Sequence, residues 1–134
     1  MATRIPNSRA RPFVETRAEF EGSNLYGQWL YDGIWYVVFS YGSHWPLHAY
    51  SEELDAWFSN EDKYSASTSR HKSQTWPRFS YDLSVAHMRY IIGKRVSQIR
   101  EIPIIDSLRK ERAKTVKRSA EPRLRGGVTL QEDA

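Results

Sequence analysis

The aromatic residues of this chain are confined to its middle, and this fixes where a hydrophobic core can form. The five tryptophans, eight tyrosines and five phenylalanines all lie between Phe13 and Tyr90. Aromatic side chains bury large apolar areas and dominate the energetics of a core. We therefore expect one α+β core domain over residues 13–93. The flanking segments, an N-terminal arm (residues 1–12) and a C-terminal tail (residues 94–134), carry too little apolar surface to pack alone.

The net charge changes at the same boundaries between arm, core and tail. The arm carries three arginines and no acidic residue, the core has a net charge of −4, and the tail has a net charge of +5. An acidic, aromatic body with cationic ends is typical of proteins whose ends contact a polyanion. The alternative interpretation is that the cationic ends only keep a small domain in solution.

The composition excludes several classes of protein. The chain contains no cysteine, which excludes disulfides, thiol catalysis and cysteine-ligated zinc. No apolar run approaches the 18 residues of a membrane span, and the first residues contain no apolar segment of the kind found in secretory signals. We therefore expect a soluble protein with no membrane partner.

The clearest structural signal is Asp32-Gly33, which stands between two segments rich in aromatic and β-branched residues. Such a dipeptide predicts a two-residue β-hairpin turn. Gly42-Ser43 is the candidate for a second tight turn. The meander strands predicted in this way are residues 23–31, 34–41 and 44–50. Residues 56–58 form either a short fourth strand or part of a helical turn.

Two-residue turns would also fix the register of these strands. Tyr36 is then opposite Trp29 in the first strand and opposite Ala49 in the third. Pro46 cannot donate a ladder hydrogen bond, so the third strand is either an edge strand or contains a bulge.

Two helices are predicted after the meander. Residues 80–92 have an apolar stripe at helical spacing and would pack on the sheet. Residues 106–119 favour a helix but offer little apolar surface to anchor it. The predicted fold is therefore a small antiparallel β-meander of three to four strands packed by one helix, with a basic helical or disordered C-terminal tail.

Two groups of basic residues are candidates for binding nucleic acid. The first lies in residues 63–77, a hydroxyl-rich segment interpreted as a loop, with an aromatic residue near each end. Hydroxyl, ammonium and guanidinium groups suit phosphate oxygens, although a polar loop that caps the next helix is an equally simple interpretation. The candidate phosphate contacts of this loop and of the tail are Arg70, His71, Lys72, Arg109, Lys110, Arg112, Lys114, Lys117 and Arg118.

One face of the predicted meander offers a possible stacking surface for bases. Aromatic side chains on a sheet stack unpaired bases in several single-strand binders. The residues of this face are Tyr26, Trp35, Phe39, His48 and Tyr50. The alternative is that a helix or the tail covers this face.

The sequence offers no strong catalytic or metal-binding pattern. His44 and His48 lie four residues apart on a predicted strand, about 13 Å, which is too far for one metal ion. No glycine-rich phosphate loop or zinc-protease motif is present. We therefore expect no enzyme activity, no metal and no other cofactor.

Two strings of residues resemble a known group of proteins. These are Tyr-Gly-x-His-Trp-Pro at residues 41–46 and Thr-Ser-Arg-His-x-Ser-Gln at residues 68–74. The chain is similar over residues 31–77 to a group of small proteins encoded by bacteriophages and plasmids, to which no activity is assigned. The resemblance implies a mobile-element origin and a location in the cytoplasm of a bacterial host.

These observations lead to one principal hypothesis and two alternatives. The principal hypothesis is a phage- or plasmid-encoded accessory protein that binds DNA or RNA through its basic tail and loop. The first alternative is a protein-binding module that inhibits or recruits a bacterial host factor. The second is a virion or assembly component.

Overall fold

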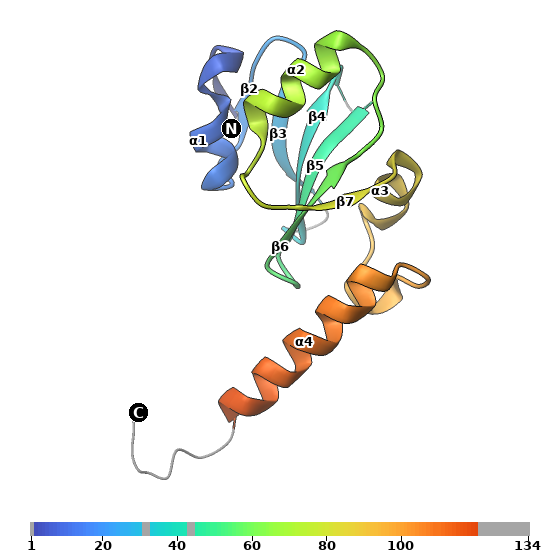
Figure 1. The fold of residues 1–134 in the computed structure, drawn as a ribbon. Coiled ribbons are helices and arrows are strands. Elements are labelled where there is room, and N and C mark those ends of the chain that lie inside the picture. The colour runs from blue at the N-terminus through green and yellow to red at the C-terminus, as the bar shows by residue number, and fades with distance from the viewer. Residues whose placement is uncertain (1, 31–32, 43–44, 121–134) are drawn as a thin grey trace. The chain divides into compact units, whose positions relative to one another are not determined.

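The computed structural model describes residues 2–30, 33–42 and 45–120, with side chains up to residue 113 (Figure 1). The strands in these residues are β1 (Thr3–Arg4), β2 (Phe20–Glu21), β3 (Leu25–Leu30), β4 (Trp35–Ser40), β5 (Trp45–Ser51), β6 (Ala56–Asn60) and β7 (Tyr81–Leu83). The helices are η1 (Asn7–Arg9), α1 (Ala10–Glu15), α2 (Ala66–Thr75), α3 (Val85–Ile91), η2 (Val96–Gln98) and α4 (Pro103–Ala120). None of these helices has the length and apolar character needed to cross a membrane.

The seven strands form one mixed sheet in the order of the sequence, β1 to β7. Strands β2 to β6 are antiparallel, whereas β1 and β7 pair in parallel with their neighbours at the two edges. The predicted α+β class is thus confirmed, but the predicted number of three to four strands is lower than the seven strands observed among the described residues. The strands missed by the sequence are only two or three residues long, too short for a pattern of alternating side chains to be recognised.

The chain divides into two compact units, Met1–Ile102 and Pro103–Ala134. The first residues belong to the sheet unit, because Thr3–Arg4 pairs with β2 and the side chain of Ala10 is fully buried. Val96 and Ile99 are also buried, although both lie in the predicted tail. The observed boundary therefore follows Ile102, and the first twelve residues are not a separate arm.

The hairpin predicted around Asp32-Gly33 is confirmed by the pairing of β3 with β4, and Asp32 itself lies outside the described residues. Trp29 pairs with Tyr36 and Leu30 pairs with Trp35, as a two-residue turn requires. Gly33 in this turn has φ +80°, a conformation that favours glycine.

The predicted register of the second and third strands holds for Trp45 and Pro46 but is wrong from Leu47 onward. Tyr36 pairs with Tyr50 rather than with Ala49, because a bulge next to Pro46 adds one residue to β5. Of the two alternatives open for a strand containing Pro46, the bulge is therefore the one observed, since β5 lies between β4 and β6. The extra residue is Leu47, which falls between the residues paired with Phe39 and Val38.

The bulge aligns a row of four aromatic rings on one face of the sheet. Trp29, Tyr36, Tyr50 and Trp57 are paired in turn across β3, β4, β5 and β6. The ring centroids of Trp29 and Tyr36 are 5.5 Å apart, and those of Tyr50 and Trp57 are 5.3 Å apart. Tyr36 and Tyr50 share one buried cluster with Val14 of α1. This row is a main part of the core.

The helix predicted over residues 80–92 begins later than expected. Tyr81–Leu83 forms strand β7 beside β6, and α3 begins at Val85. The Ser84 side chain caps the helix by accepting a hydrogen bond from the His87 backbone N–H. The sheet unit also contains α1 and α2, so it is packed by more than the one helix predicted (Figure 1).

Gly27 provides a test of this core. A Cβ atom at this position would lie 2.4 Å from both the Phe20 ring and the Tyr36 hydroxyl oxygen. We predict that Gly27→Ala lowers the free energy of unfolding by about 1–3 kcal/mol, because the neighbouring rings must move to admit the methyl group. Urea unfolding measures the change. Gln28→Ala alters an exposed residue of the same strand and is the control; equal stability of the two variants would contradict the packing.

Candidate functional site

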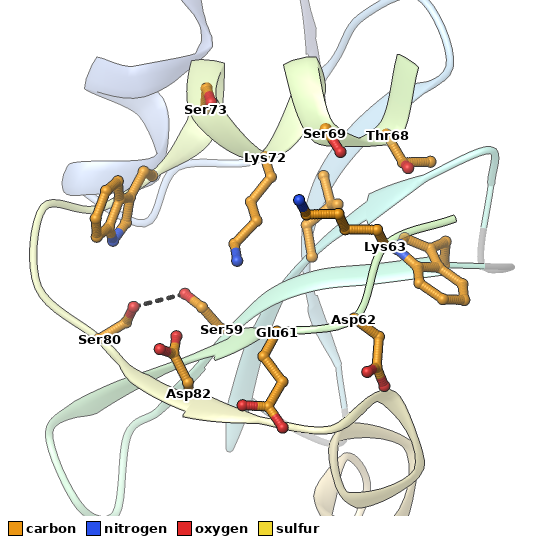
Figure 2. Close-up of a pocket in the computed structure, with 13 residues that line it drawn as sticks. Ser59, Glu61, Asp62, Lys63, Thr68, Ser69, Lys72, Ser73, Ser80 and Asp82 are labelled. Atoms are coloured by element: carbon orange, nitrogen blue, oxygen red, sulfur yellow. Dashed lines mark hydrogen bonds between the residues drawn. The ribbon is translucent and has the colours of Figure 1, made fainter. Parts of the chain in front are cut away.

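A pocket of about 330 Å³ lies between α2 and the strands β5, β6 and β7 (Figure 2). Its walls include Leu47 of the β5 bulge, Ser59 of β6, Asp82 of β7, and Thr68 and Lys72 of α2. Pockets of about this size accommodate small molecules or single groups of a larger ligand. The pocket is therefore the candidate site in the sheet unit.

Helix α2 begins at a defined cap. The Ser65 side chain accepts a hydrogen bond from the Thr68 backbone N–H (3.1 Å), and the Thr68 hydroxyl accepts one from the Ser65 N–H (2.9 Å). This reciprocal pair is a capping box. The helix ends before Trp76, where Pro77 follows.

The face that α2 turns toward the protein is polar. Its buried residues are Thr68, His71 and Thr75. Residues 66–75 were predicted as a loop because no apolar side chain marks a helical period there. That prediction is wrong. Hydrogen bonds of two buried histidines connect the helix to the sheet, while the Thr75 hydroxyl bonds within the helix.

Two buried histidines provide these hydrogen bonds. His48 Nε2 donates to the Lys72 carbonyl oxygen (3.1 Å), and its Nδ1 accepts from the Ser59 hydroxyl (2.7 Å). A carbonyl oxygen can only accept, so the proton of the neutral imidazole lies on Nε2. His71 connects the helix to the sheet from the other side: it lies on α2, and its Nδ1 is 2.7 Å from the Ser40 hydroxyl of β4.

Burial keeps both imidazoles neutral. It lowers the pKa of His48 from 6.5 to about 3, against the opposing effect of the hydrogen bond to the Lys72 carbonyl. Burial and then the positive charge of Arg70 lower the pKa of His71. Both rings therefore bind α2 to the sheet as uncharged groups at neutral pH.

The pocket contains charged groups that are not neutralised by each other. The ammonium groups of Lys63 and Lys72 both point into the space between α2 and the strands, and Asp82 approaches from β7 (Figure 2). None of these three side chains forms an ion pair with another described residue. Unpaired charges of both signs in one pocket favour a ligand that carries an anionic group and hydrogen-bond donors.

Aromatic rings lie near both ends of α2. Trp76, which follows the helix, lines the pocket and is 48% exposed. Tyr64, which precedes the helix, is 58% exposed, and its ring centroid lies 5.1 Å from that of Trp45, another lining residue. The Arg89 guanidinium lies 5.6 Å from the Trp45 ring centroid. Trp76 is therefore the aromatic residue that both lines the pocket and keeps an exposed ring surface, whereas Trp45 is buried.

The structure separates the three basic residues predicted for the 63–77 segment. Arg70 is exposed on α2, His71 is buried, and only Lys72 lines the pocket. Successive residues of a helix point in different directions, so the three side chains do not form one patch. His71 is therefore not an accessible phosphate contact.

The basic residues predicted in the tail lie on helix α4. Lys110 and Arg112 are exposed, whereas the Arg109 guanidinium donates to the Asp106 carboxylate. The remaining three residues belong to the same helix, but their side chains lie outside the described part of the chain. They are Lys114, Lys117 and Arg118.

The predicted stacking face is corrected by the structure. Trp35, Phe39, His48 and Tyr50 are all buried, so none of these four rings is open to a base. The bulge also places His48 and Tyr50 on the sheet face opposite to Trp35 and Phe39. Only Tyr26 is half-buried.

Hydrolytic chemistry has little support in this geometry. Ser80 and Ser59 are hydrogen-bonded (2.6 Å), and Ser59 leads to His48, which resembles a serine–histidine arrangement. A general base works best with a pKa near the working pH, however, and burial lowers that of His48 to about 3. The imidazole also faces a carbonyl rather than a carboxylate. The network is therefore structural, and the absence of enzyme activity stays a prediction.

Metal binding has no candidate group among the residues that the structure describes. His44, which was weighed with His48 as a ligand pair, lies outside those residues. His48 is fully committed, because both of its ring nitrogens are hydrogen-bonded within the protein.

The sequence did not single out Trp45, Asp82, Ser59 and Ser80 as residues of a site. They come from three separate strands or strand borders, and only the folded sheet brings them together. One local signal was available for α2: the Ser65-x-x-Thr68 spacing is that of a capping box.

The chain matches no protein-family model. No curated protein and no solved structure matches it either. The resemblance to phage and plasmid proteins stays a prediction.

The buried state of His48 predicts how stability depends on pH. Unfolded His48 binds a proton near pH 6.5, whereas in the folded protein it does so only near pH 3. The contribution of neutral His48 to the free energy of unfolding is therefore complete above pH 6.5 and is lost as the pH falls toward 3. We expect the free energy of unfolding to fall by about 2 kcal/mol between pH 7.5 and pH 5 from this residue.

Urea unfolding at the two pH values tests this expectation. His48→Asn should be less stable at pH 7.5 and should show a weaker loss at pH 5. His87→Asn removes an exposed imidazole on α3 and is the matched control. An undiminished loss in His48→Asn would contradict the assignment of a neutral His48.

Proposed function

We propose that this protein binds single-stranded nucleic acid, with the α2 pocket as its principal contact. One observation carries the proposal: Lys63 and Lys72 extend unpaired ammonium groups into a pocket that is bordered by aromatic rings. Single-strand binders combine cations that contact the phosphates with aromatic faces that stack the bases.

Each component of the site has a role in this proposal. The ammonium groups of Lys63 and Lys72 contact phosphate oxygens, and the hydroxyls of Ser69 and Ser73 on α2 offer further donors. Trp76 stacks on a base, because about half of its surface is exposed beside the pocket. A duplex keeps its bases stacked on each other, so this site favours a single strand.

Helix α4 adds contacts of a different kind. Its exposed cations, Lys110 and Arg112, attract phosphates without reading bases. We propose that α4 strengthens binding to single and double strands alike, whereas the pocket gives the preference for a single strand.

The first test is the salt dependence of binding. Fluorescence anisotropy with a labelled 12-nucleotide single strand should give affinity that falls steeply from 50 to 200 mM NaCl. We expect Lys63→Gln and Lys72→Gln each to weaken binding and to reduce the slope of log K against log salt by about 0.7, the value for one lost phosphate contact on a single strand.

Two controls separate the pocket from general electrostatics. Lys94→Gln removes a lysine whose ammonium lies over the Tyr90 ring, outside the pocket lining, and should leave the slope nearly unchanged. The double variant Lys110→Gln/Arg112→Gln should weaken single-strand and duplex binding equally. Absence of single-strand binding, or wild-type slopes in both pocket variants, would overturn the proposal.

The second test concerns stacking. We expect Trp76→Ala to weaken single-strand binding by about tenfold or more, since a base–aromatic stack is worth about 1–3 kcal/mol. Phe79→Ala is a matched control, because Phe79 is 67% exposed but does not line the pocket. Stacking should also quench tryptophan fluorescence in the wild-type protein. Equal effects of the two substitutions would show that Trp76 has no special role.

A further inference from the structure

Asp82 is the carboxylate that faces Lys72 across the pocket. It lies on the edge strand β7, where it pairs in register with Ser59 of β6. Lys72 approaches from α2 and Asp82 from the opposite wall, next to Ser80 (Figure 2). The two charges form no ion pair with each other or with any other described residue.

The other two acidic residues of the pocket are placed differently. The Asp62 carboxylate accepts a hydrogen bond from the Val85 backbone N–H (2.8 Å), which fixes it at the start of α3. The Glu61 side chain extends away from Lys72 (Figure 2). Asp82 is therefore the acidic group best placed to meet a ligand held by the lysines.

A carboxylate at this position is unfavourable for phosphate but suitable for one edge of a base. An ionised carboxylate only accepts hydrogen bonds and can accept two side by side. The Watson–Crick edge of guanine presents two adjacent donors, N1–H and the N2 amino group. Adenine and cytosine present a donor next to an acceptor, and thymine or uracil presents one donor between two acceptors. Only guanine matches both carboxylate oxygens.

We infer that the α2 pocket selects guanine, and that Asp82 is its specificity-determining residue. This inference rests on the proposed binding of single strands. In it, Trp76 stacks on the base, Lys63 and Lys72 hold the adjoining phosphates, and the Asp82 carboxylate accepts from N1–H and the N2 amino group.

Nine-nucleotide strands that contain G, A, C or T at the central position of an otherwise all-thymine sequence provide the test. We expect the wild-type protein to bind the G strand about fivefold or more tightly than the other three, as a bidentate contact to a base provides. Asp82→Asn and Asp82→Ala should abolish this preference. Affinity for the all-thymine strand should stay the same or rise, because a negative charge near the phosphates is removed.

Glu52→Gln removes the same charge from an exposed turn outside the pocket and should retain the preference for guanine. Thermal unfolding of each variant confirms that it is folded. Equal wild-type binding of all four strands, or a preference that persists in both Asp82 variants, would overturn the role of Asp82 and leave the proposed function standing. Absence of binding to every strand would overturn both.

Discussion

His48 connects the sheet to helix α2 because its two ring nitrogens bond to different parts of the molecule. Nδ1 accepts from Ser59 of β6, and Nε2 donates to the backbone carbonyl of Lys72. Burial keeps the ring neutral, and with its proton on Nε2 the neutral ring accepts at Nδ1. The bond to the carbonyl fixes the backbone from which the Lys72 side chain enters the pocket, so the placement of that ammonium depends on His48.

The position of His48 depends in turn on one extra residue in β5. The bulge next to Pro46 rotates the following part of the strand, so that His48 and Tyr50 point to the face that α2 covers. Without the bulge, both side chains would point to the opposite face. Tyr50 would then leave the aromatic row, and His48 would not reach the helix. One backbone irregularity thus serves both the core and the site.

The sequence predicts those parts of the sheet that are determined by residues close together in the chain. The Asp-Gly turn sets the pairing of Trp29 with Tyr36 because a two-residue turn leaves no choice of register. Pro46 indicated either an edge strand or a bulge, but it did not say where the extra residue of a bulge would fall. That position is decided by which side chains gain from burial on each face, such as Tyr50 against Trp57, and this involves strands far apart in sequence.

The site was only partly predictable for a related reason. The prediction of phosphate contacts in residues 63–77 stays a prediction, and the helix in this segment was missed because its buried face consists of Thr68, His71 and Thr75. Such a face is stable only when partners such as Ser40 exist on the sheet, and a local sequence pattern does not reveal such partners.

The buried polar side-chain atoms of the described residues nearly all have a hydrogen-bond partner. Gln74 Oε1 is the single exception among them. The charged groups of the pocket are of a different kind, because Lys63 and Asp82 are exposed and Lys72 is half-buried, so water can reach them. We propose α2 as the site of function because these charges gather beside the exposed Trp76 ring in one pocket.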